Sequence, residues 1–294
     1  MRTRLTTTMS RHPVVAYAIL TYCISWTLVL PLALNGMGVT RLPMPSGWHA
    51  VGALGPITAA FIVTAMVDGR NGVRTLLKSM GRWRVGWLWW AIGAGTPILM
   101  FVLAVVGVGV SSRHWLDFSQ TFATPSSAWF WVVDGVVAAM LYAVGEEPGW
   151  RGFALSRLQN RWNAIIATLL VFVAWAIFHF PFFFYRYDFG LGTIVGFLVG
   201  LLAGAVWLTY LYNSTGGSVL VVMVWHALFN LANAITIAAD PDATAVMSVI
   251  AIVLGVVALV IGKPTRLSSE RQTPATQPAR VASASSGATT GLTW

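Results

Sequence analysis

Two adjacent carboxylates and one guanidinium stand inside an apolar stretch of this chain. Glu146 and Glu147 are two of its three glutamates, and Arg151 follows four residues after the second. The stretch reads Gly145-Glu146-Glu147-Pro148-Gly149-Trp150-Arg151-Gly152-Phe153. An ionised side chain at the centre of a bilayer costs roughly 3 kcal/mol unless it is paired or hydrogen-bonded. These groups therefore indicate a buried ion pair, a site that does chemistry, or both.

The two glutamates cannot serve the same purpose, because neighbouring side chains on a helix point about 100° apart. Glu147 and Arg151 are four residues apart and can pair along one helix face, so we assign them a structural or orienting role. Glu146 has no local cationic partner, which suits a carboxylate that accepts and returns a proton. Pro148 removes one helix hydrogen bond, so we expect the helix to be kinked or irregular at this point.

Two histidines and an amide can join Glu146. His179 and His226 fall within apolar runs, while the other three histidines lie in loops or at the ends of such runs. His226 and Asn230 are four residues apart and share one helix face, so they can present two polar groups to one point. Trp175 stands four residues before His179, and we interpret it as a packing residue that walls the site.

Three kinds of site fit one carboxylate, two imidazoles and one amide. In the first, Glu146 and His179 hold and deprotonate a water molecule. His226 and Asn230 then stabilise the oxyanion formed on a peptide carbonyl. In the second, Glu146, His179 and His226 bind zinc, which activates the water. In the third, the same groups relay protons or ions in a transporter. The zinc set lacks a local ligand pair such as His-x-x-x-His, so no cofactor is favoured.

Composition places these groups in a membrane protein. Of the 294 residues, 57% are hydrophobic and 9% are charged, whereas a soluble domain carries roughly 25% charged residues. The net charge of +9 is spread in short clusters between apolar runs. Such clusters of basic residues in loops determine how a membrane protein is oriented in the bilayer, and they do not indicate nucleic-acid binding. We expect Cys23, the single cysteine, to be buried and inert.

The apolar runs predict an all-α membrane protein with about eight transmembrane helices and one interfacial amphipathic helix. Seven runs have limits near 13–34, 48–67, 85–110, 162–184, 191–212, 218–239 and 244–261. The remaining span, the fourth, lies between Asp134 and Arg157. They are 23 residues apart, or roughly 34 Å at ~1.5 Å per residue, so Glu146 should lie near mid-membrane.

Two shorter patterns refine this prediction. Residues 70–84 place five basic side chains opposite apolar ones at helical spacing, which predicts the amphipathic helix in the membrane interface. In the sixth span, glycines recur every four residues, which favours close packing against a neighbouring helix over a substrate groove. These glycines are Gly192, Gly196, Gly200 and Gly204.

Eight spans put both termini on one side of the membrane. Fourteen of the 18 basic residues fall on that side, so the positive-inside rule predicts cytoplasmic termini in a plasma membrane. We divide the chain into three N-terminal spans with the amphipathic linker (1–126), a helical core that carries the site (127–262) and a disordered cytoplasmic tail (263–294).

The polar segments, taken together and in order, resemble the three motifs of the CAAX protease and bacteriocin-processing (CPBP, or Abi) family. The matching positions are Glu146-Glu147-x-x-x-Arg151-Gly152, an aromatic residue four before His179, and His226-x-x-x-Asn230. Trp175 stands where phenylalanine is usual in that family, and Pro148-Gly149 occupy variable positions of the first motif.

The resemblance implies an eight-helix intramembrane endopeptidase. In that family the residues corresponding to Glu146 and His179 activate water, and those corresponding to His226 and Asn230 form the oxyanion hole. Glu147 and Arg151 match the remaining motif positions. Members are described both as metalloproteases and as metal-independent glutamic proteases, and we favour the second type for this chain.

We therefore expect CAAX-type or leader-peptide-like processing of a peptide or protein substrate that is lipidated or membrane-associated. Membrane lipids are the other expected partner. A zinc-dependent form of the same peptidase, with Glu146, His179 and His226 as ligands, stays open as an alternative. So does a protein without enzymatic activity, either a transporter or a bacteriocin-immunity protein.

Overall fold

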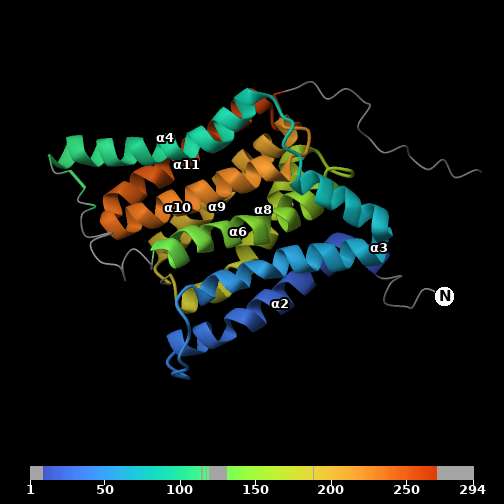
Figure 1. Ribbon diagram of the computed structural model, residues 1–294, viewed down its shortest axis with the longest axis horizontal. Helices are drawn as coiled ribbons and strands as arrows, with labels where there is room; N and C mark the ends of the chain where they lie inside the picture. The colour runs from blue at the N-terminus through green and yellow to red at the C-terminus, as the bar shows by residue number, and fades with distance from the viewer. Residues whose placement is uncertain (1–8, 114, 117, 119–130, 188, 270–294) are drawn as a thin grey trace, which may run out of the picture.

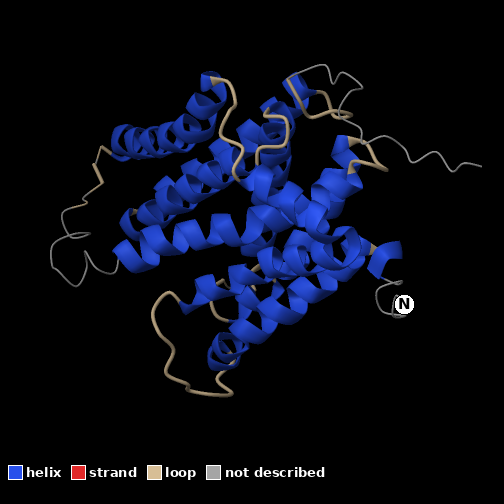
Figure 2. Cartoon of the chain, turned by 45° about the vertical axis from the view of Figure 1, so that its right-hand side comes forward, coloured by secondary structure: helices blue, strands red, loops and turns tan. Residues whose placement is uncertain are grey.

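The structure is a computed structural model that describes residues 9–113, 115–116, 118, 131–187 and 189–269 (Figure 1). Within these residues every regular element is a helix and none is a strand (Figure 2), which confirms the all-α prediction. The α-helices are α2 (Pro13–Gly36), α3 (Leu54–Met80), α4 (Trp87–Ser112), α6 (Ala138–Glu147), α7 (Ser156–Leu158), α8 (Ala164–Phe178), α9 (Leu191–Ser214), α10 (Val219–Ala239) and α11 (Pro241–Gly262). The 3-10 helices are η1 (Trp48–Ala53) and η4 (Phe180–Phe184), and the π-helices are η2 (Trp131–Val137) and η3 (Pro148–Leu155).

Seven helical segments of the described chain are long and apolar enough to cross a membrane. They correspond to all the predicted spans except the fourth. Six of them begin and end within a few residues of the predicted limits, and the second continues through the basic stretch to Met80. The fourth is also helical, since η2, α6, η3 and α7 follow one another without a break. It is not among the seven, and it carries three ionisable side chains near its centre, Glu146, Glu147 and Arg151.

The helix that carries the glutamates lies inside the bundle. Figure 1 shows α6 between α3 and α10, with α2 beyond α3 and α4 beyond α10. Helix α6 contacts both α3 and α10, α2 contacts α3, and α4 contacts α10. Behind α6, the aromatic rings of Tyr17, Trp150 and Phe178 pack edge to face at centroid distances of 5.5 and 5.8 Å. Both carboxylates are buried there, with 5% of Glu146 and none of Glu147 exposed.

Successive helices run in opposite directions, so the start of α2 and the end of α11 lie at the same end of the bundle (Figure 1). The other end carries the connections from α2 to η1, from η4 to α9 and from α10 to α11.

The basic stretch at residues 70–84 is helical up to Met80 and forms the second half of α3, which the non-helical backbone of Gly69 separates from the first half. The two halves meet at a kink at Gly69, whose φ of 64° lies in the region that favours glycine. Just before the kink, Asp68 forms an ion pair with Arg157, which joins the end of the first half of α3 to the end of the glutamate-bearing helix.

Two sequence-based expectations are wrong. Cys23 is exposed on α2 and not buried. The glycines of α9 do not pack against another helix, because a Cβ added at any of the four would meet no atom within 4 Å. Of the predicted tail, residues 263–269 are described, with Leu267 fully buried, and the remainder lies outside the described residues.

Candidate active site

The chain changes helical geometry at the motif itself. Helix α6 ends at Glu147, and Pro148 begins the π-helical η3, so the predicted irregularity is confirmed. A side chain at Gly145 would collide with the backbone of Ala53, so α6 lies directly against the junction of η1 and α3. This close approach brings a segment more than ninety residues earlier in the sequence beside the glutamates.

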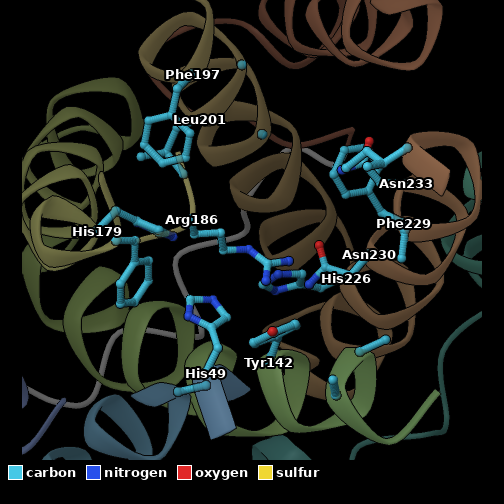
Figure 3. Close-up of a pocket in the computed structure, with 18 of the residues that line it drawn as sticks. His49, Tyr142, His179, Arg186, Phe197, Leu201, His226, Phe229, Asn230 and Asn233 are labelled. Atoms are coloured by element: carbon cyan, nitrogen blue, oxygen red, sulfur yellow. The ribbon is translucent and has the colours of Figure 1, made fainter. Parts of the chain in front are cut away.

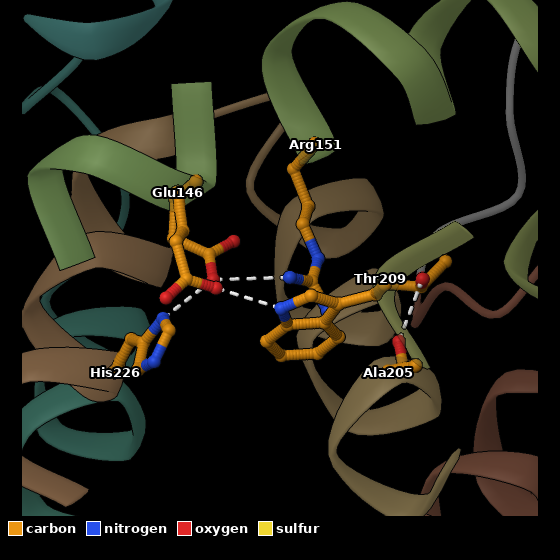
Figure 4. Close-up of polar contacts among 7 residues, drawn as sticks. Glu146, Arg151, Ala205, Thr209 and His226 are labelled. Carbon is orange, nitrogen blue, oxygen red and sulfur yellow. Dashed lines mark hydrogen bonds and ion pairs between the residues drawn. The ribbon is translucent and has the colours of Figure 1, made fainter. Parts of the chain in front are cut away.

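Glu147 lies at the centre of a buried polar cluster. Its Oε1 accepts a hydrogen bond from Nη1 of Arg151 at 3.0 Å and one from Nδ1 of His226 at 2.6 Å (Figure 4). The side chains of Glu147 and Arg151 are fully buried. The ion pair expected from their spacing is therefore formed, and His226 joins it from α10. Because Nδ1 donates to the carboxylate, the Nε2 atom of His226 remains for another partner.

Glu146 points to a different partner. Its Oε2 accepts a hydrogen bond from the indole Nε1 of Trp175 at 2.7 Å (Figure 4). The guanidinium of Arg151 stacks over the same indole, with Cζ 4.5 Å from the ring centroid. Trp175, which the sequence predicts to wall the site by packing, therefore also supplies a hydrogen-bond donor to Glu146.

His179 stands where α8 gives way to η4. Its Nδ1 is 2.7 Å from the carbonyl oxygen of Trp175. A carbonyl only accepts, so Nδ1 carries the hydrogen, and Nε2 keeps a lone pair that can accept a proton. The ring packs at 5.2 Å from Phe182 and 5.1 Å from Phe197, which fixes its orientation.

One cavity of about 920 Å³ brings the four predicted catalytic residues together (Figure 3). Glu146, His179, His226 and Asn230 all line it, whereas the buried Glu147 and Arg151 do not. Trp175 lies between the two imidazoles, with centroid distances of 5.9 Å to His179 and 6.0 Å to His226. The cavity therefore combines a carboxylate, two ring nitrogens and an amide with room for a substrate segment.

The zinc ligand set is not assembled in this arrangement. Across the described ranges, no three His, Cys, Asp or Glu side chains are grouped so that they could hold a metal ion together. The Nδ1 atom of His226 is hydrogen-bonded to Glu147, and the Nδ1 atom of His179 is hydrogen-bonded to the carbonyl oxygen of Trp175. The geometry does not fit the alternative in which Glu146, His179 and His226 are common ligands.

Several residues that line the cavity are not predicted from the sequence. His49 comes from η1, and its Nδ1 is 2.5 Å from the hydroxyl oxygen of Tyr185. Burial raises the pKa of Tyr185 well above its usual value, so the hydroxyl stays protonated and can donate to His49. Arg186 and Tyr187 follow in the same loop and also line the cavity. No local spacing signals this group, because it forms only when the segment from η1 to α3 packs against α6.

The comparisons with known proteins cover the same region. Residues 127–232, which include the four cavity residues above, match the family described as type II CAAX prenyl endopeptidase Rce1-like. The chain is similar to CAAX prenyl protease 2 of Methanococcus maripaludis, with 28% identity over 141 residues. That alignment covers 46% of this chain and 50% of the relative, so the chain spans about half the length of the curated relative that it matches.

Proposed function

Because the chain belongs to the Rce1-like type II CAAX prenyl endopeptidase (CPBP/Abi) family, we propose that it is an intramembrane endopeptidase of the glutamic type. The observation that carries this proposal is the single cavity lined by Glu146, His179, His226 and Asn230. The substrate is a peptide or protein, lipidated or membrane-associated, and residues 127–262 form the catalytic core.

The proposed reaction begins with a water molecule held between Glu146 and Nε2 of His179. Glu146 accepts a proton from this water as its oxygen attacks the peptide carbonyl carbon. The hydrogen bond from Trp175 keeps the carboxylate in place and leaves its other oxygen for the water. When the C–N bond breaks, Glu146 returns the proton to the leaving amine.

His226 and Asn230 stabilise the negative charge that develops on the carbonyl oxygen. Asn230 donates through its side-chain amide. To donate from Nε2 while Nδ1 is bonded to Glu147, His226 must carry both ring hydrogens, and the Glu147 carboxylate stabilises the resulting positive charge. Arg151 holds that carboxylate from the other side. The buried cluster thus orients a residue that touches the substrate without contacting the substrate itself.

Replacing Glu146 with glutamine tests the assignment. Glu146→Gln preserves size and can still accept from Trp175, but it cannot accept the water proton, so cleavage of a fluorogenic peptide by the purified protein should fall by at least about 100-fold. Glu270→Gln, at the one glutamate outside the motif, is the matched control and should retain full activity. Equal activity of the Glu146→Gln and wild-type proteins would remove the basis of the mechanism.

The same assay separates the alternatives. A strong chelator should leave the rate unchanged, whereas loss of activity that zinc restores would establish the metal-dependent form. Ion-coupled flux in liposomes without any cleavage would identify a transporter. To find the natural substrate, new peptide termini are compared between cells that contain the wild-type protein and cells that contain the Glu146→Gln variant.

A further inference from the structure

The cavity holds a positive charge that the proposed chemistry does not use. Among the described residues that line it, Arg186 is the one lysine or arginine. It follows η4 in the connection to α9, and its backbone N–H donates to the carbonyl of Phe182 at 2.8 Å. Figure 3 shows its side chain extending from the side of His179 toward His226 and Asn230. The guanidinium is thus anchored at its base and directed over the catalytic groups.

Arg186 has no carboxylate partner in the part of the chain that the structure describes. The ion pairs formed there by arginines are Arg151 with Glu147 and Arg157 with Asp68. Glu146, the carboxylate that lines the cavity, accepts from Trp175 instead. A guanidinium facing a largely aromatic and aliphatic cavity is therefore available to an anion that enters from outside.

We propose that Arg186 binds a carboxylate of the substrate inside the cavity, either its free C-terminal carboxylate or the side chain of an Asp or Glu. This inference rests on the proposed peptidase function and specifies the substrate class of that site. The planar guanidinium donates two parallel hydrogen bonds to a carboxylate, which fixes position as well as charge. A carboxylate held by Arg186 sets which peptide bond lies at Glu146.

The neighbouring residue supports such a subsite. Tyr187 lines the same cavity, and burial raises the pKa of its phenol. The phenol therefore stays neutral and adds no competing negative charge. Its oxygen accepts a hydrogen bond from the guanidinium of Arg186, which helps to hold that group at the cavity. His49, from η1, also lines this cavity, and its Nδ1 is 2.5 Å from the hydroxyl oxygen of Tyr185.

The test measures kcat and KM for four matched fluorogenic peptides. The first pair has a free C-terminal carboxylate or a C-terminal amide, and the second pair is amidated and carries Asp or Asn at the same position. Arg186→Gln should lower kcat/KM for the preferred carboxylate substrate by about 10- to 100-fold, mainly through KM, and leave its neutral counterpart unchanged. Arg186→Lys keeps the positive charge but cannot donate two parallel hydrogen bonds, so its kcat/KM should lie between those of the wild-type and Arg186→Gln proteins. Which pair responds identifies the source of the carboxylate.

Arg41→Gln is the matched control, because Arg41 lies in the α2–η1 connection at the same end of the bundle but does not line the cavity. It should leave all four peptides unaffected. If Arg186→Gln lowers kcat/KM equally for all four peptides, Arg186 has a structural role and not a binding role. If kcat/KM does not change for any of them, Arg186 does not contact the substrate. Either result overturns the inference.

Binding separates this inference from the peptidase proposal. Labelled peptides are titrated against the Glu146→Gln protein, with and without Arg186→Gln. A carboxylate preference that disappears with Arg186 supports the subsite even if the wild-type protein cleaves nothing. Cleavage without that preference keeps the peptidase and rejects the subsite.

Discussion

At the scale of single residues, Trp175 does more than fill space. Phenylalanine supplies the same flat wall between two histidines, but only tryptophan adds the N–H that donates to Glu146 at 2.7 Å. A carboxylate held by one oxygen has fewer orientations, so its second oxygen meets the water more often in the productive geometry. Trp175 is therefore a positioning residue in the proposed mechanism.

We predict that Trp175→Phe lowers kcat by about tenfold with little change in KM, because the indole N–H acts on the catalytic carboxylate and not on the substrate. Steady-state kinetics with a fluorogenic peptide measures both constants. Trp207→Phe is the matched control, since Trp207 is also a buried tryptophan but its indole N–H has no hydrogen-bond partner. If the two variants lose equal activity, the hydrogen bond carries no special role.

The sequence identified these residues only as far as local spacing allows. Four-residue intervals predicted the pair of Glu147 with Arg151 and the shared face of His226 and Asn230. The contact of His226 with Glu147 spans 79 residues, and that of Trp175 with Glu146 spans 29. Such contacts depend on how whole helices pack, which no spacing within one helix encodes.

At the scale of elements, α9 forms a wall of the cavity where the sequence suggested a packing seam. Gly196, Gly200 and Gly204 line the cavity, and no atom would touch a Cβ at any of them. The four-residue spacing correctly indicates a face without side chains. It does not reveal whether that face meets a helix or an empty volume, because both require small residues.

We predict that Gly200→Val makes the cavity narrower without destabilising the fold. The added methyl groups enter open space, and valine is no worse than glycine in a helix. Peptides with bulky residues next to the scissile bond should lose most of their kcat/KM, whereas peptides with small residues there should be cleaved as before. The assay compares matched peptides with alanine or phenylalanine at that position.

Gly192→Val serves as the control, because Gly192 shares the stripe but does not line the cavity. It should not change the size preference. If Gly200→Val lowers the melting temperature and all activities together, α9 packs more closely at that point than the prediction assumes.

At the scale of the whole molecule, the cavity belongs to one end of the bundle. Its walls come from the ends of α8 and α10 and from the starts of α6, α9 and α11. Since the helices alternate in direction, this end lies opposite the start of α2 and the end of α11. The distribution of basic residues predicts that those chain ends face the cytoplasm. We therefore predict that the cavity opens on the side of the membrane away from the cytoplasm.

Cysteine labelling tests this orientation in intact cells. In a Cys23→Ser background, Ser46→Cys places a thiol at the cavity and Thr265→Cys places one just after α11. A membrane-impermeant maleimide should label the first protein in intact cells and the second only after permeabilisation. The reverse pattern would put the cavity on the cytoplasmic side.

Hydropathy predicted the positions of seven apolar spans, because burial in lipid requires long apolar runs, and the fourth predicted span is helical but less apolar. It did not predict that the N-terminal part contributes to the cavity through His49, since amphipathic pattern within a segment says nothing about which distant segment it meets. The division of the chain at residue 126 remains a prediction.

The helix that carries the two glutamates also has a consequence for biogenesis. It is not among the seven segments apolar enough to cross a membrane by themselves. The groups that satisfy its polar side chains, the indole of Trp175 and the imidazole of His226, are synthesised 29 and 79 residues later. Arg151 lies in the same segment, but these two partners do not yet exist when the ribosome releases it. We therefore predict that the segment inserts stably only after α8 and α10 have been synthesised. The segment that carries the glutamates would then depend on helices that follow it in the sequence for its place in the membrane.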